Sequence, residues 1–214
     1  MHGAAPALAR VPSTAADDAR AAWDPARDAF DARPPEVLAR LAGAGDARAF
    51  TVLVERYHAR CVRFARNMGL DREDAEEAVQ DAFVRVHRAL PRFREDSPFE
   101  PWLFRVLANR CRSTHARARW RRRAVPDGDA RLAGCAASDD AAADLDAEAL
   151  RDLVARTLAE LSPEQREAFL LRHVEQLSYE EIARATGARL STLRMRVKRA
   201  CDAVHARLRR EGVL

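Results

Sequence analysis

A basic helix-turn-helix pattern is the part of the sequence whose residue types and spacing point most directly to a function. Residues 177–200, LSYEEIARATGARLSTLRMRVKRA, contain a helix-start signal at Ser178, a turn at Gly187 and an arginine-rich segment after it. Two short helices joined by a tight turn are typical of DNA-binding units, in which the second helix enters the major groove. The alternative is a solvated basic face on an ordinary helical bundle.

The segment after Gly187 predicts a helix with one apolar and one polar face. Leu193, Val197 and Ala200 recur at helical spacing, so they should face the core. Arginine can bond to the edge of guanine, while hydroxyl groups and lysine can hold phosphates. The side chains predicted to face DNA are Ser191, Thr192, Arg194, Met195, Arg196, Lys198 and Arg199.

A second basic segment begins among aromatic residues. Residues 101–126 carry eight arginines and no acid, and Phe93, Phe99, Trp102 and Phe104 lie just before or within its start. Arginines beside aromatic rings suit single-stranded or melted DNA, because exposed bases stack on the rings. The alternative is that Trp102 and Phe99 belong to the hydrophobic core.

Charge alternates in blocks along the chain, although the 214 residues carry a net charge of only +4. Residues 71–81 hold six acids against one arginine, and residues 127–152 are acidic. Residues 184–210 hold nine basic residues against the single acid Asp202. Separate basic blocks of this kind indicate two surfaces that each meet a polyanion.

The sequence contains no constellation typical of catalysis or metal binding. It lacks a Gly-rich phosphate loop and a nucleophile with a base at suitable spacing, which disfavours an enzyme such as a nuclease. Its four cysteines lie far apart, as in proteins of a reducing cytosol. Neither the pair His58 and Cys61 nor the pair Cys111 and His115 finds further zinc ligands nearby. We predict no enzymatic activity, no cofactor and no metal site.

The composition predicts an all-α fold of two small helical domains. Alanine, leucine, arginine and glutamate favour helix, and strand-like runs are absent. Helical periodicity is lost where Gly, Pro, Asp and Ala dominate. We predict a disordered N-terminal arm over residues 1–35, a helical domain over 36–123, a flexible acidic linker over 124–147 and a second helical domain over 148–214. No run of about 18 apolar residues is present, so we expect a cytoplasmic protein without a membrane span.

Helix-start residues recur ahead of the apolar, periodic segments. A serine or aspartate there can accept a hydrogen bond from a backbone N–H of the first turn. The predicted N-caps are Asp46, Asp71, Ser97, Ser162, Ser178 and Ser191. Three of these serines are followed three residues later by Glu100, Gln165 or Glu181, which completes a capping box. Gly69 should end the first long helix, and Pro91 the second.

Three segments together resemble a known family. They are DREDAEEAVQDAFVRVHRALPRF at 71–93, WLFRVLANR at 102–110 and LSPEQREAFLLRHVEQLSYEEIARATGARLSTLRMRVKRA at 161–200. They look like the extracytoplasmic-function group of bacterial RNA polymerase sigma factors, in family order and spacing. The resemblance implies a first domain that binds core polymerase and the melted −10 element, and a second that reads the −35 element. It implies that the whole factor supports promoter opening for transcription initiation. It also implies an anti-sigma factor as a partner.

The resemblance further implies which residues make each contact. Glu77, Gln80 and Asp81 match positions that contact the clamp helices of the polymerase β′ subunit, and the β subunit is a further partner. The positions implied for the −10 element are Arg94, Asp96, Ser97, Trp102, Arg105, Asn109, Arg110 and Arg112. Those that match the −35-reading helix are Arg194, Met195, Lys198 and Arg199.

The sequence departs from the family pattern at a few of these positions. Glu95 stands where a glycine is common in the −10 capture loop. Met195 replaces a small residue of the reading helix, and Arg189 replaces a usual proline. We therefore expect unusual base preferences at both promoter elements.

A stand-alone helix-turn-helix repressor or activator is the main rival function. Such a protein needs neither an acidic helix that faces polymerase nor an aromatic segment that binds a DNA strand. Residues 71–81 and 93–104 supply those two features here, which favours the sigma factor.

Overall fold

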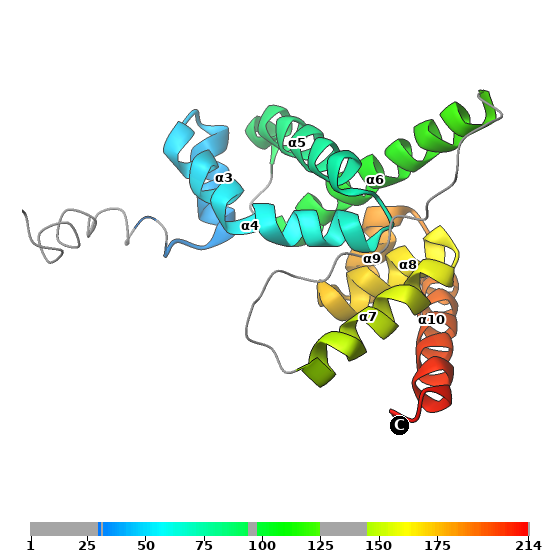
Figure 1. Ribbon diagram of the computed structural model, residues 1–214. Helices are drawn as coiled ribbons and strands as arrows, with labels where there is room; N and C mark the ends of the chain where they lie inside the picture. The colour runs from blue at the N-terminus through cyan, green and yellow to red at the C-terminus, as the bar shows by residue number, and fades with distance from the viewer. Residues whose placement is uncertain (1–29, 31, 94–97, 125–144, 214) are drawn as a thin grey trace, which may run out of the picture. The chain divides into compact units, whose positions relative to one another are not determined.

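The computed structural model describes residues 30, 32–93, 98–124 and 145–213, and every regular element within them is a helix (Figure 1). The predicted all-α fold is therefore confirmed. The chain divides into two units, Met1–Pro34 and Pro35–Leu214, and the description below concerns the second. Nearly all of the predicted N-terminal arm, and residues 125–144 of the predicted linker, lie outside the described residues. The domain boundaries stay a prediction.

The first helical group comprises α3 (Pro35–Gly43), α4 (Ala47–Asn67), α5 (Arg72–Ala89), the short 3₁₀ helix η1 (Leu90–Arg92) and α6 (Phe99–Ala124). Asp46 and Asp71 cap α4 and α5 as predicted, with carboxylate oxygens that accept from the N–H groups of Ala49 and Asp74. Gly69 follows α4 with a φ of +93°, which a residue without a Cβ adopts readily. The predicted ends of α4 and α5 are therefore correct.

Side chains at helical spacing build the core of this group. Val79 and Val86 of α5 are fully buried, as the periodicity predicts. Phe64 of α4 and Phe104 of α6 are fully buried too, and their rings meet edge to face with centroids 5.4 Å apart. This aromatic contact fixes α6 against α4, and α6 carries the second basic segment.

The second helical group comprises α7 (Leu145–Glu160), α8 (Pro163–Phe169), the π-helical turn η2 (Leu170–Val174), α9 (Tyr179–Thr186) and α10 (Leu190–Arg210). Ser162 and Ser178 form the predicted capping boxes with Gln165 and Glu181. Gly187 ends α9 in the left-handed region, at a φ of +72°. The helix predicted from Ser162 to about His173 changes at Leu170 into the π-helical turn.

The N-cap predicted at Ser191 is wrong. Helix α10 begins at Leu190, its N-cap is Arg189, and no side chain caps it. The carbonyl of Arg189 already accepts the first helical bond, from Leu193 N–H at 3.0 Å, so Ser191 lies inside the first turn. Only three residues, 187–189, therefore separate α9 from α10, which is the short turn that a helix-turn-helix needs.

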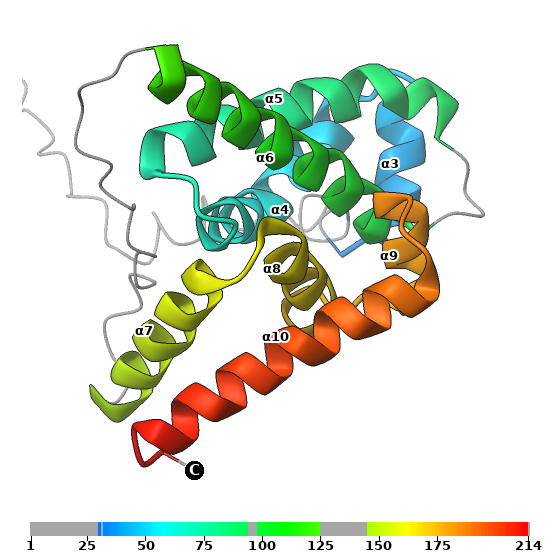
Figure 2. The same ribbon diagram turned by 90° about the vertical axis from the view of Figure 1, so that its right-hand side faces the viewer.

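The two helical groups pack against each other within the unit Pro35–Leu214. Helix α9 lies against α6, and α7 contacts α4 (Figure 2). Within the described residues, no helix is long and apolar enough to cross a membrane.

The difference between a true cap and a first-turn serine can be measured. We expect Ser178→Ala to lower the free energy of unfolding by about 1 kcal/mol, because the Ser178 hydroxyl oxygen accepts the N–H of Glu181 in the first turn of α9. The matched control, Ser191→Ala, should change it by less than about 0.5 kcal/mol. Urea unfolding followed by circular dichroism measures both, and equal losses would contradict the assigned start of α10.

Candidate nucleic-acid interface

Helix α10 presents the polar face that its spacing predicts. Leu193, Val197 and Ala200 are buried against the second helical group. The exposed side chains are Ser191, Thr192, Arg194, Met195, Lys198 and Arg199, whereas Arg196 is half-buried. Six of the seven residues predicted to face DNA are thus exposed to solvent.

The cations of this face differ in how they are held. The Arg194 guanidinium lies over the ring of Tyr179, 5.7 Å from its centroid, which orients the side chain from α9. Lys198 pairs with Asp202 at 2.6 Å, but both side chains are largely exposed, so water weakens the pair. Arg199 makes no hydrogen bond or ion pair within the described part of the chain. Its guanidinium can therefore meet DNA without breaking an existing contact.

The aromatic segment that precedes the second basic block is partly core. Phe99 and Phe104 are fully buried, so neither can stack on a base, and the core alternative is correct for Phe99. Trp102 is half-buried and packs on the half-buried Phe93, with ring centroids 5.1 Å apart. Trp102 and Phe93 are thus the rings of this segment that retain exposed surface.

The start of α6 is capped in a way that was not predicted. The N–H of Phe99 donates to Oε1 of Glu36 in α3, at 3.0 Å. Glu100, expected in a capping box, instead accepts from the hydroxyl of Tyr57 at 2.9 Å and from Arg60 at 3.0 Å. Ser97, its expected partner, lies outside the described residues.

The residues predicted for the −10 element occupy three kinds of site. Arg105 and Asn109 are exposed on α6. Arg110 and Arg112 are half-buried, and each is bonded to an acid, Asp81 and Glu167 respectively. Arg94, Asp96 and Ser97 lie outside the described residues.

The acidic helix α5 shares its charges with the basic helix α6. Glu77 Oε1 accepts from Arg117 at 2.7 Å, and Asp81 Oδ2 accepts from Arg110 at 2.5 Å. Gln80 is exposed between them. The ion pairs with α6 therefore explain part of the one-sided negative charge of α5. The separate charge blocks in the sequence did not predict that these two helices pair with each other.

An open groove of about 660 Å³ lies between α4 and α5. Its wall is formed mainly by Phe50, Val54, Phe83 and Val84, and Val84 is 43% exposed. Gln80 also lines it, so the groove continues the surface that the resemblance assigns to polymerase. No motif in the sequence predicted this groove.

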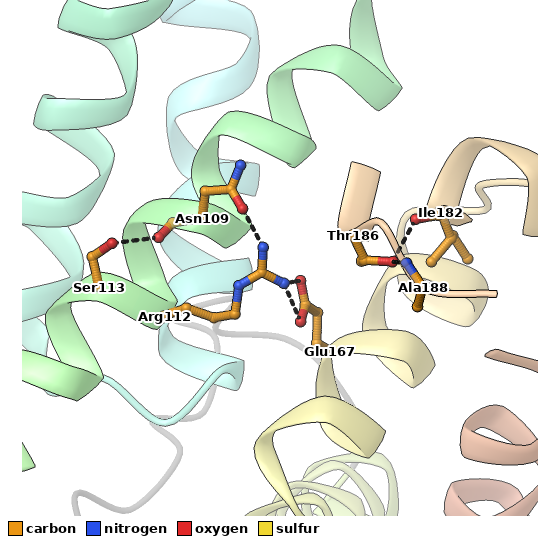
Figure 3. A network of polar contacts seen from close by, with 7 residues as sticks. All are labelled: Asn109, Arg112, Ser113, Glu167, Ile182, Thr186 and Ala188. Atoms are coloured by element: carbon orange, nitrogen blue, oxygen red, sulfur yellow. Dashed lines mark hydrogen bonds and ion pairs between the residues drawn. The ribbon is translucent and has the colours of Figure 1, made fainter. Parts of the chain in front are cut away.

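Two buried acids form the most unusual electrostatic feature. Glu167 and Glu175 are each only 3% exposed. Glu167 accepts two bonds from Arg112 Nη1, at 2.6 and 2.8 Å (Figure 3), and Glu175 accepts from Arg60 Nε at 2.6 Å. Burial raises the pKa of both carboxyls, while the facing arginines oppose the rise.

Neither buried acid was predicted, although a signal was present. Glu167 and Glu175 each lie four residues from Leu171, which is fully buried. Helical spacing therefore places Glu167 on the buried face, whereas Glu175 lies just after the π-helical turn and beyond the helix predicted from Ser162 to about His173. A buried acid requires a cationic partner, but the spacing could not say which of the 37 basic residues supplies it.

The cysteines and histidines do not gather into a ligand set within the described residues. Cys61 and Cys111 are buried, and burial raises the pKa of the Cys111 thiol to about 12. His58 pairs with Glu76 at 3.4 Å, and Nε2 of His115 lies 2.9 Å from the carbonyl oxygen of Met68.

The two ion pairs between α5 and α6 should differ in their effect on stability. Asp81→Asn should lower the free energy of unfolding by about 1 kcal/mol, because it leaves the half-buried Arg110 without its acid. Glu77→Gln is the matched control and should cause no measurable change, since its pair is exposed. Urea unfolding of both variants measures the difference, and an equal effect would show that Asp81 is an ordinary surface acid.

Comparison with known families agrees with this geometry. The profile "Sigma-70 region 2" matches residues 53–122, which hold most of the first helical group. The profile "Sigma-70, region 4" matches residues 151–204, which hold the helix-turn-helix.

Curated relatives and solved structures extend over most of the chain. The chain is 35% identical to the RNA polymerase sigma-H factor of Pseudomonas aeruginosa over 167 residues, 75% of this chain and 86% of that protein. It is 34% identical to the ECF RNA polymerase sigma-E factor of Escherichia coli over 176 residues, 79% of this chain and 91% of that protein.

Two solved structures are similar in fold and in sequence. CnrH in complex with the cytosolic domain of CnrY is 31% identical, with a TM-score of 0.59 over 81% of this chain and 96% of that one. The sigma factor RpoE from Bartonella quintana, bound to the anti-sigma factor NepR, is 26% identical, with a TM-score of 0.63 over 76% of this chain and 98% of that one. With both regions matched in order and these identities, the chain belongs to the extracytoplasmic-function family of RNA polymerase sigma factors.

Proposed function

We propose that this chain acts in the cytoplasm as a promoter-specificity subunit of RNA polymerase, with no chemistry of its own. It binds the core enzyme, recognises the −35 and −10 elements and supports promoter opening. The observation that carries the proposal is the exposed basic face of α10, mounted on a helix-turn-helix inside the region 4 match. DNA reading is the function that such a face supports best.

The −35 element is read from the first half of α10. Arg199 is exposed and without a partner among the described residues, so we assign it a base contact. Two neighbours on the same face are proposed to enter the DNA major groove with it. They are Arg194, which Tyr179 orients, and Met195, which is 50% exposed. The remaining members of the face hold phosphates: Ser191, Thr192, Arg196 and Lys198.

The −10 element is bound along α6. The half-buried Trp102 keeps some exposed surface on which a base can stack, and the exposed Arg105 and Asn109 follow the strand. Arg110 and Arg112 also bind the strand, after they separate from Asp81 and Glu167. Arg94, Asp96 and Ser97 complete the proposed set.

Core polymerase docks on α5 through Glu77, Gln80 and Asp81. The groove between α4 and α5 lies next to Gln80 and offers apolar surface to a helix of the β′ clamp, while the β subunit is a further contact. An anti-sigma factor is proposed as an additional partner, since both structural neighbours are complexes and one of them, RpoE, is bound to an anti-sigma factor.

The first test concerns base reading by α10. Arg199→Ala should cost about 1–3 kcal/mol of binding free energy at one promoter position and relax specificity there. Arg196→Ala is the comparison: it should weaken binding on every sequence and lower the salt slope by about one unit. The measurement is binding and transcription over a library of −35 variants at two salt concentrations. An even loss over the library for Arg199→Ala would make that residue a phosphate contact.

The second test concerns docking on polymerase. The double variant Glu77→Arg with Gln80→Arg should reduce co-purification with core enzyme at least about tenfold, because it reverses the charge of the surface proposed to meet polymerase. Asp81 is left intact, since it holds Arg110. The control is Glu160→Arg, an exposed acid at the end of α7. Undiminished co-purification of a folded double variant would remove α5 from the polymerase interface.

A further inference from the structure

A methionine lies in the middle of the polar face of α10. Met195 is 50% exposed, and no large apolar side chain in the described part of the chain is more exposed. The residues three or four positions away from it on the helix are all exposed and polar: Ser191, Thr192, Lys198 and Arg199. Because these positions are the neighbours of Met195 on the helix surface, the methionine has no apolar partner on its own face.

Packing of the fold does not explain this methionine. The apolar side chains that attach α10 to the second helical group are Leu193, Val197, Ala200 and Val204, and all four are buried. Met195 lies two positions from Leu193 and two from Val197, so the helix turns it about 200° away from each of them. Its exposed surface is therefore available to a partner of the helix and is not used in the core.

The neighbours of Met195 show which way it faces. Arg194 is held toward α9 by the ring of Tyr179, and the next residue turns about 100° from it. Met195 and Arg199 are four positions apart, so they differ by only about 40° and face the same side of the helix. Arg199 makes no hydrogen bond or ion pair among the described residues, and the proposed function assigns it a base contact. Met195 therefore shares the side of α10 on which a base is expected.

The base edges in the major groove offer one apolar group to such a side chain. Guanine, cytosine and adenine present hydrogen-bond donors and acceptors there, whereas thymine also presents its 5-methyl group. The thioether of methionine is no donor and only a weak acceptor, so it gains little from the polar edges. It is flexible and fits irregular apolar surfaces. The small residue that Met195 replaces in the family pattern has less apolar surface with which to cover the methyl group.

We propose that Met195 selects thymine in the −35 element by packing its side chain against the thymine 5-methyl group. The inference rests on the proposed function, and it names the base that this departure from the family pattern recognises. Withdrawing one methyl-sized apolar group from water changes an affinity about fourfold. The contact therefore contributes a moderate preference for thymine, beside the hydrogen bonds of the neighbouring base reader Arg199.

The experiment removes the methyl group without changing the base pairing. Polymerase holoenzyme that contains the full chain first selects a −35 element from the promoter library. Each thymine of either strand is then replaced in turn by uracil, and the affinity is measured for wild type, Met195→Ser and the control Val174→Ser. Val174 is a matched control because it is 49% exposed but lies on η2, outside the polar face of α10. Circular dichroism verifies that both variants keep their helix content.

We expect one thymine at which uracil weakens wild-type binding about fourfold, close to the base pair whose specificity Arg199→Ala relaxes. Met195→Ser should lose this penalty, whereas Val174→Ser should keep it. A selected element without thymine, the absence of any uracil penalty, or a penalty that Met195→Ser retains would each overturn the inference but leave the proposed function intact. Failure of the wild-type holoenzyme to select any −35 sequence would instead overturn the proposed function.

Discussion

A carboxylate withdrawn from water requires a cation within bonding distance, and this requirement organises the unit Pro35–Leu214. Glu167 and Glu175 are both almost completely buried, and each meets an arginine from the other sigma region. Without Arg112 and Arg60, those acids would carry uncompensated charge in an apolar setting. The packing of region 4 on region 2 therefore depends on these two contacts, and one of them holds Arg112, which is proposed to bind the −10 strand.

Ion pairs also join the acidic helix α5 to the basic helix α6. Asp81 pairs with Arg110, and Glu77 pairs with Arg117, so the basic helix neutralises part of the charge of the acidic helix. A surface proposed for polymerase and a surface proposed for DNA are thus coupled through shared ion pairs.

In helix α10, by contrast, most of the cations are exposed to water. Its apolar residues recur at helical spacing and anchor one face, which leaves the opposite face in water. Most of its cations are exposed, and the ion pair on that face, between Lys198 and Asp202, is exposed as well. Among the described residues, the face proposed to read the −35 element is thus open to solvent, whereas Arg110 and Arg112, proposed for the −10 strand, are bonded to acids.

The sequence alone determined the helices and the family, because caps and periodicity act over three or four residues. Asp46, Asp71, Ser162 and Ser178 each cap a helix through a backbone N–H three positions away. Only the tertiary structure decided which charges meet. Arg112 and Glu167 are separated by 55 positions, Arg60 and Glu175 by 115, and no local pattern selects one arginine among many. Partner choice depends on how helices pack, and packing is a property of the assembled core.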